Sequence, residues 1–504
     1  MMKQGNVPKN FRHRRHGCAA AICLLLTACA LPHDPGARQS VLSDSRLAIP
    51  ADLAAVDSAT APDTQWPHPQ WWRQYGDPQL DGLIEAALAQ SPTLAVVQAR
   101  ERQSKTLVAQ AEASEGLMVG LDATLDRQSV SQNGFLGPFS ITNPQLGTTG
   151  PWYTEGSLGL GAEYSVDLWG KNRARVEASM GVHEARQAEL RHAELLLSTE
   201  IAHTYIGLQG EWAQQAVLAQ SIRIAEASAR DHRAKADQGL EPRAADGTSQ
   251  ARALELNRQL TISESNVLMA RERLRELCGL GPDGLATLGA RPLPDTPTQL
   301  PSQLGYELLA RRPDLQALQA SVRASLSQID AAKAAFYPSF DIRAFAGLDS
   351  LHLDDLLKSS SRQYNLIPGL SLPVFDSGRL NAHLAGARAQ SDIAIAQYNE
   401  VIVRAVREVA QASVQAESLK RQRELQAEKL ERLQHQLGMA QAQRAQGLLQ
   451  RTAADEASLP LLQERSRAIT LQTAQWQNRI SLVTALGGGY EAPVPQRRHG
   501  ASTN

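Results

Sequence analysis

The sequence predicts a mainly helical protein that also carries a few two-faced β-strands suited to a membrane. Two observations predict this fold class. Within 156–238, a stretch that alternates in hydrophobicity runs directly into a very long helical stretch, and the second half of the chain repeats the first. We therefore expect two repeats, each consisting of a helix, two strands, a long helix and a final helix.

The alternating stretch lies at the start of 156–238. Apolar side chains occupy every second position there, namely Leu158, Leu160, Ala162, Tyr164, Val166 and Leu168. This period of two is typical of a strand with one apolar and one polar face. From Trp169 no proline occurs until Pro242, and good helix formers dominate. A helix of about seventy residues is roughly 100 Å long, so we expect an elongated protein whose strands lie outside a globular core.

The repeat is visible in aligned segments of the two halves. "SPTLAVVQARERQ" from Ser91 aligns without gaps to "RPDLQALQASVRA" from Arg312, and "LCGLG" and "ALGGG" end the two halves. The first repeat covers 77–290, with a helix over 77–115 that starts at Asp77 and Pro78, strands over about 117–127 and 156–168, and helices over 168–238 and 248–278. A Pro-rich connector, 291–301, leads to the second repeat, 302–490, with strands over about 339–347 and 363–373 and helices over 302–336, 375–446 and 452–486.

The lengths of these helices match within each repeat. The two shorter helices together are as long as the long one. We therefore expect an antiparallel helical tube with the strands at one end and the turns at Gly239 and Gly447 at the other. Both glycines are predicted to end their helices in the left-handed conformation, and Pro460 is predicted to kink the helix that contains it. The segment 128–151 is predicted to be a loop, and 491–504 a flexible tail.

The N-terminal 28 residues are predicted to be a targeting segment. A basic lead precedes an apolar run over 18–26 that is too short to span a bilayer. The sequence Leu26-Thr27-Ala28-Cys29 resembles a bacterial lipobox, which implies cleavage before Cys29 and acylation of its thiol. The alternative is an ordinary signal peptide with an incidental cysteine. We expect 29–76 to be a lipid-anchored lead, and this lipid to be the only attached group, with no cofactor.

Charge and cysteine content narrow the class of protein. The formal net charge of −1 argues against a nucleic-acid partner. Cys18 and Cys23 would leave with the targeting segment, so Cys278 has no partner for a disulfide. No later stretch reaches about eighteen uninterrupted apolar residues, so a membrane would have to be crossed by strands.

Four strands cannot close a barrel in a membrane, so the chain must oligomerise if it spans one. Two copies would give eight strands around a bore filled by side chains, and three would give twelve around a channel. A soluble sandwich is the alternative. The expected lipid face consists of Leu158, Leu160, Tyr164, Val166, Tyr364, Leu366, Leu370 and Leu372. The expected water face consists of Asp122, Asp126, Glu163, Gln363, Asn365 and Ser371.

Several motifs, in this order, resemble one family. "WWRQYGDPQLDGLI", "YSVDLWGKNRARVEA", "LLARRPDLQA", "LPVFDSGRLNAHLAGARAQ" and "ALGGGY" are similar to the TolC-like outer membrane factors, in the lipoprotein branch of efflux pumps. The resemblance implies a homotrimer in the outer membrane, with a twelve-stranded β-barrel continued by a periplasmic α-helical barrel. Its implied partners are a periplasmic adaptor and an inner-membrane transporter. The implied function is passive export of drugs, dyes or aromatic compounds.

The inner tip is where single residues are expected to act. The candidate gate residues surround the turns at Gly239 and Gly447 and are Asp237, Asp246, Arg451, Asp455 and Glu456, with Arg444 beside them. In a trimer each acid becomes a ring of three, which favours cations. Relatives often carry a carboxylate just after the second glycine, whereas this chain has Gln450 and Arg451. The alternative interpretation is a solvated helix end without a gating role.

We expect no enzyme. The sequence lacks HExxH, GxSxG and GxxxxGK[ST] motifs. His183, His192 and His203 do not have the spacing of four that a helical metal pair needs. Two alternatives to the efflux channel remain: a lipid-anchored periplasmic coiled-coil scaffold without a pore, and a conduit of the same fold that secretes polypeptides.

Overall fold

The computed structural model describes residues 39–42, 67, 70–134, 142–143, 148–149, 151–293 and 311–490. Two compact units are present. We call Gln103–His183 with Ala320–Ala396 the strand unit, and Val41–Arg102, Glu184–Gln319 and Gln397–Asn504 the helix unit. The targeting segment, Cys29 and the tail 491–504 lie outside the described residues, as do most of the lead and of the connector.

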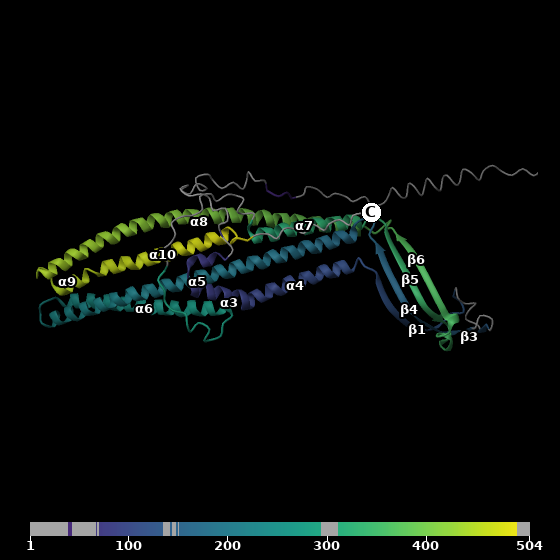
Figure 1. Cartoon of the computed structure of the whole chain (residues 1–504), viewed down its shortest axis with the longest axis horizontal. Coiled ribbons are helices and arrows are strands. Elements are labelled where there is room, and N and C mark those ends of the chain that lie inside the picture. The colour runs from purple at the N-terminus through teal and green to yellow at the C-terminus, as the bar shows by residue number, and fades with distance from the viewer. Residues whose placement is uncertain are drawn as a thin grey trace, which may run out of the picture. The chain divides into compact units, whose positions relative to one another are not determined.

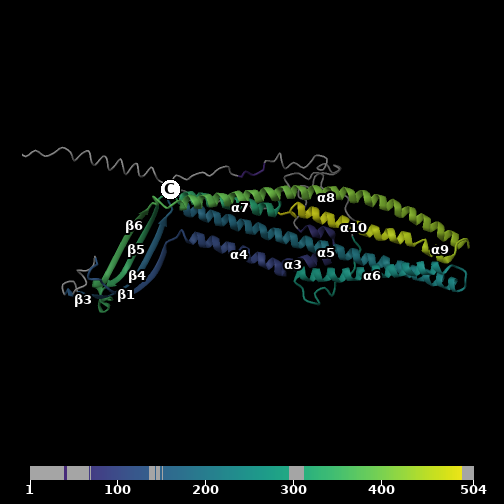
Figure 2. The ribbon, with the colours of Figure 1, turned by 180° about the vertical axis from the view of Figure 1, so that it is seen from behind.

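The strand unit contains one four-stranded antiparallel sheet in the order β1-β4-β5-β6. Figures 1 and 2 both show these strands side by side. Their bounds are Met118–Ser129 (β1), Trp152–Val166 (β4), Ser339–Ser350 (β5) and Arg362–Ser371 (β6). The central pairing of β4 with β5 joins the two repeats. Within the described residues, β1 and β6 pair with nothing on their outer edges.

The strands overlap all four predicted ranges but differ from them by one to four residues at most ends, and two of these ends matter for the strand faces. β4 stops at Val166 because the Asp167 carboxylate (Oδ2) accepts a hydrogen bond from the Arg173 amide at 2.9 Å and so begins the next helix. β6 stops at Ser371, so Leu372 is not part of the strand face. The predicted loop 128–151 also contains a small two-stranded sheet, Thr142–Asn143 (β2) with Thr148–Thr149 (β3).

The register places polar side chains together on one face of the sheet. Glu163 lies opposite Arg343, and the Glu163 Oε1 and Arg343 Nε atoms are 3.3 Å apart. Phe345 lies on the same face, although the sequence analysis did not single it out. Its ring lies so close to Gly159 and Gly347 that a Cβ atom on either would come within 2.7 Å of it. The two glycines therefore provide the space that this ring occupies.

Parts of four helices belong to the strand unit. They are the second half of α4 (Pro92–Ala113), most of α7 (Pro313–Ala334) and the first turns of α5 (Lys171–Asp237) and α8 (Arg379–Ala445). Gly181 of α5 lies so close to α7 that a Cβ atom there would be 2.9 Å from the Ala324 Cβ atom. Ile329 and Ala332 of α7 and Leu384 of α8 form a small buried core in this unit.

The helix unit contains η3 (Trp71–Tyr75), α3 (Pro78–Gln90), α6 (Arg243–Cys278), α9 (Arg451–Glu456), α10 (Leu459–Ala485) and the greater part of α5 and α8. Its core gathers the aromatic rings of η3 against Trp476, with the Tyr75 and Trp476 ring centres 4.5 Å apart. Asp77 caps α3 by accepting the Gln79 amide, as the Asp77-Pro78 start predicts, and it also accepts a hydrogen bond from the Tyr205 hydroxyl at 2.5 Å.

Five predicted helices differ from the structure in their bounds. The helix expected over 77–115 is two helices, because Pro92 disfavours the helical conformation at Ser91, which has ψ 126°. α6 begins at Arg243 and not at Thr248, directly after Pro242. α5 begins at Lys171 and α8 at Arg379, each a few residues later than predicted. In the second repeat α7 begins only at Pro313, and 302–310 are outside the described residues.

The helix predicted over 452–486 is interrupted directly before Pro460 and is not one helix kinked at that residue. α9 ends at Glu456 and α10 starts at Leu459, and Ala457 and Ser458 form a turn between them with αR backbone angles. Pro460 therefore lies in the first turn of α10, where its missing N–H would have no partner within the helix. Among the described helices, none is long and apolar enough to cross a membrane.

Candidate functional site

The two predicted tip turns have the same backbone geometry. Gly239 has φ 71° and Gly447 has φ 75°. After each glycine, the next amide donates to a carbonyl five residues back, from Leu240 to Lys235 at 2.8 Å and from Leu448 to Gln443 at 2.9 Å. This pattern is the Schellman motif. Nothing lies within 4 Å of a Cβ atom built on either glycine, so positive φ alone requires glycine there.

The predicted gate residues separate into different contacts. Asp455 lies 3.3 Å from Arg444 and 3.5 Å from Arg451. Asp246 lies 3.9 Å from Arg233 and accepts a hydrogen bond from Gln250 at 2.6 Å. Glu456 turns away from these pairs, toward α5.

Asp237 is exposed, and its side chain makes no hydrogen bond or ion pair with any described residue. The five predicted gate residues therefore do not form one cluster within the chain.

The sequence analysis missed His232, which contacts one carboxylate from each repeat. Its Nδ1 atom is 2.5 Å from Glu241 Oε2, and its Nε2 atom is 3.2 Å from Glu456 Oε1. The His232 side chain is 19% exposed. The signal that could have found it is a histidine in the last turns of a helix, where a positive charge is favoured by the helix dipole.

Further side chains connect the same elements. Lys235 lies 3.2 Å from Glu241 and donates to the Gln450 side chain at 2.9 Å. Thr452 donates to the Asp231 carboxylate at 2.7 Å, and Ser228 donates to Glu456. The end of α5 is thus joined to α9 and to the residues just before it.

The pKa of His232 is raised. The hydrogen bond to Glu241 is the largest cause, burial opposes it, and the hydrogen bond to Glu456 raises the pKa further. The same contact with His232 is the largest cause that lowers the pKa of Glu241, and Lys235 assists. Both shifts favour the charged forms of this pair.

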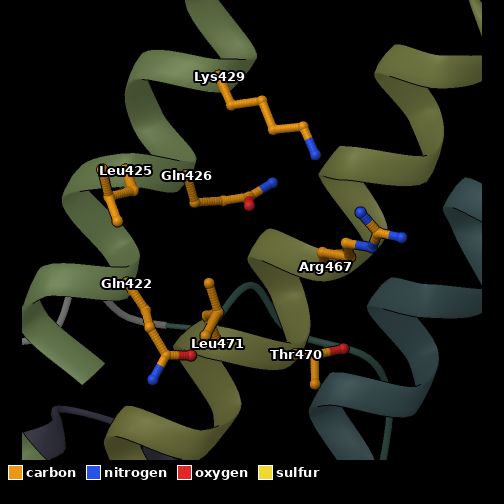
Figure 3. Close-up of a pocket in the computed structure, with 7 residues that line it drawn as sticks. All are labelled: Gln422, Leu425, Gln426, Lys429, Arg467, Thr470 and Leu471. Carbon is orange, nitrogen blue, oxygen red and sulfur yellow. The ribbon is translucent and has the colours of Figure 1, made fainter. Parts of the chain in front are cut away.

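A groove of about 430 Å³ lies between α8 and α10 (Figure 3). Its lining includes Lys429 from α8 and Arg467 from α10, and both cations pair with Glu464, at 2.8 Å and 2.6 Å. Glu464 is only 5% exposed and also accepts a hydrogen bond from Gln426 at 3.0 Å. Burial by itself raises the pKa of Glu464, but the hydrogen bonds from Lys429 and Gln426 lower it overall. Lys429 therefore joins α8 to α10 through Glu464, whereas Arg467 pairs with Glu464 within α10.

The part of the chain that the structure describes contains no group of three or more His, Cys, Asp or Glu side chains that could hold a metal ion. Cys278 is buried and free.

Comparison with known proteins gives a consistent result. The family model described as "Outer membrane efflux protein" matches residues 83–280 and 304–488. The multidrug resistance outer membrane protein MdtP of Escherichia coli K12 is 40% identical over 475 residues, which cover 94% of this chain and 96% of MdtP.

Two solved structures share the fold. The outer membrane protein VceC of Vibrio cholerae has a TM-score of 0.75 and 29% identity, and covers 84% of this chain and 100% of VceC. The CmeC outer membrane channel of Campylobacter jejuni has a TM-score of 0.77 at 18% identity, covers 92% of this chain and 95% of CmeC, and supports the fold alone. The chain therefore belongs to the outer membrane efflux protein family.

Proposed function

We propose that this chain is the outer membrane channel of a tripartite multidrug efflux system, and that it exports drugs, dyes or aromatic compounds. The chain itself would catalyse no reaction. A periplasmic adaptor and an inner-membrane transporter would deliver the cargo and supply the energy. Its membership of the efflux family and its similarity to MdtP and VceC support this assignment.

The observation that carries the proposal is the four-stranded sheet. β4 alternates apolar and polar side chains, and β1 and β6 have outer edges that are unpaired within the described chain. Unpaired backbone groups in lipid are costly, so the edges need partners from other copies. Three copies would place β6 of one chain beside β1 of the next and close twelve strands around an aqueous bore.

In this barrel the polar face of the sheet would line the bore. The face carries Asp122, Glu163 and Asp341, and its Arg343 is already paired with Glu163. A bore with an excess of carboxylates favours cations. Acylation of Cys29 would add a lipid anchor at the N-terminus of the mature chain.

Electron microscopy of the detergent-purified protein, sorted by symmetry, tests the channel. We expect threefold hollow particles. Monomers or solid rods would overturn the trimeric channel and would favour a periplasmic scaffold. In cells, deletion of the gene is expected to raise the accumulation of a fluorescent dye, and the wild-type gene to restore export. Unchanged dye accumulation with threefold particles would favour a polypeptide conduit.

A further inference from the structure

We propose that His232 is a pH-dependent clamp between the two repeats, and that loss of its proton releases α9 from α5 at the tip of the channel. The inference rests on the proposed function, because the clamp would regulate opening of that same channel. It goes beyond the predicted gate residues, of which only Glu456 takes part.

The contacts of the imidazole ring carry the argument. Each ring nitrogen faces a carboxylate oxygen, Nδ1 at 2.5 Å from Glu241 and Nε2 at 3.2 Å from Glu456. Carboxylates only accept hydrogen bonds, and a neutral imidazole has one N–H group. Both contacts can therefore be hydrogen bonds only when the ring is protonated. In the neutral ring, one nitrogen lone pair faces a carboxylate oxygen and repels it.

The two carboxylates belong to different parts of the chain. Glu241 lies in the turn between α5 and α6, whereas Glu456 ends α9 in the second repeat. The contact with Glu241 is the shorter one and lies next to the parent helix, so the contact with Glu456 is the one expected to break. Loss of the proton would therefore release α9 from α5 and leave the contact between His232 and Glu241 intact.

α9 is suited to such a release. It has six residues, and a turn at Ala457 and Ser458, where the backbone angles stay αR, separates it from α10. Its contacts with α5 include Thr452 with Asp231, and Glu456 with Ser228 and His232. A helix this short has little stability of its own, so its position depends on these contacts.

The surrounding charges set the pH range. On α5, Lys235 faces Glu241, and the Asp231 carboxylate accepts a hydrogen bond from Thr452. Arg233 of α5 pairs with Asp246 of α6. Asp455 of α9 pairs with Arg444 of α8 and with Arg451 of α9. The two carboxylates at the ring raise the pKa of His232 above its ordinary value. The clamp is thus complete below the ordinary histidine pKa and is lost as pH rises through the raised value. At the acid side it persists until Glu241, whose pKa is lowered, takes up a proton.

Hydrogen exchange of the full-length protein in detergent tests the clamp directly. Peptides over 228–241 and 450–458 are followed at about pH 6 and about pH 9, corrected for the intrinsic rate. In the wild type we expect protection to fall by about tenfold at the higher pH, the effect of losing one charged hydrogen bond. His232→Gln and Glu456→Ala are expected to show the low protection at both pH values. His435→Gln, an exposed histidine of α8, is the matched control and should behave as the wild type.

Single-channel conductance of the same four proteins tests the consequence. Wild type and control should open more often at the higher pH, and the two clamp variants should open often at both. If hydrogen exchange in the two tip peptides depends neither on pH nor on His232, the clamp is overturned, whatever the conductance. If hydrogen exchange in the tip peptides behaves as expected but the protein shows no conductance, the clamp stands and the channel function is overturned instead.

Discussion

At the scale of single residues, the helix unit depends on a few buried charges. Arg312 is 5% exposed and lies just before α7. Its guanidinium group lies 2.8 Å from Asp314 and 2.7 Å from Glu408 of α8, and it donates to the Ala485 carbonyl at the end of α10 at 3.1 Å. One side chain thus holds three helix segments together.

We expect Arg312→Gln to destabilise the protein strongly. The substitution leaves two carboxylates and a carbonyl without their cation, and breaking a buried ion pair costs about 3–5 kcal/mol. Thermal unfolding followed by circular dichroism measures the effect as a lowered midpoint. The matched control is Arg404→Gln, because Arg404 is 46% exposed and pairs with Glu400 on one helix face at 3.6 Å. Such a surface pair contributes about 0–1 kcal/mol. Equal effects of the two substitutions would contradict the role of Arg312.

At the scale of elements, helix ends decide where the chain turns. Gly447 and Gly487 both have positive φ, 75° and 83°. Their surroundings differ, because the Cβ position at Gly447 is open while that at Gly487 lies 2.9 Å from the Arg311 carbonyl oxygen and from the Arg312 Cα atom. Gly487 therefore lets the end of α10 approach the residues that begin α7.

We expect Gly447→Ala and Gly487→Ala to differ in their cost. At Gly447 only the left-handed backbone is unfavourable for alanine, which costs about 1–2 kcal/mol. At Gly487 the added methyl group also collides with the backbone beside Arg312, so the unfolding midpoint should fall further. Gly447→Asn is the control, since asparagine tolerates positive φ better than alanine and should lower the midpoint least. A Gly487→Ala protein as stable as Gly447→Ala would show that the close approach is unimportant.

At the scale of the whole molecule, the number of free thiols tests how the chain is processed. The sequence has four cysteines. If Cys18 and Cys23 leave with the targeting segment and Cys29 carries a lipid, only Cys278 remains as a thiol. Cys278 is fully buried, and burial raises the pKa of its thiol to about 11.

We therefore expect the mature protein to resist alkylation when folded and to react once per chain in denaturant. Mass spectrometry of the protein labelled with a maleimide measures both values. Cys278→Ser is the control and should take up no label in either state. Two labels per unfolded wild-type chain would show that Cys29 is not acylated, and rapid labelling of the folded protein would contradict the burial of Cys278.

The sequence by itself determined the local features of this protein. The period of two marked the faces of β4, the absence of proline marked the length of α5, and positions such as Gly239 and Asp77 marked where helices end or begin. These features depend on neighbours along the chain, so periodicity and backbone preference are enough to predict them.

Only the tertiary structure decided which distant residues meet. Alternation assigns a side chain to a face of a strand but does not choose the partner strand, so the pairing of β4 with β5 across the repeats needed the fold. The same holds for Arg312 with Glu408 and for His232 with Glu456, which lie on different helices far apart in the sequence. The histidine by itself looks like any other polar residue of a helix. It becomes a bridge because packing brings Glu241 of the first repeat to one ring nitrogen and Glu456 of the second repeat to the other. A pattern along a single helix cannot predict such a contact.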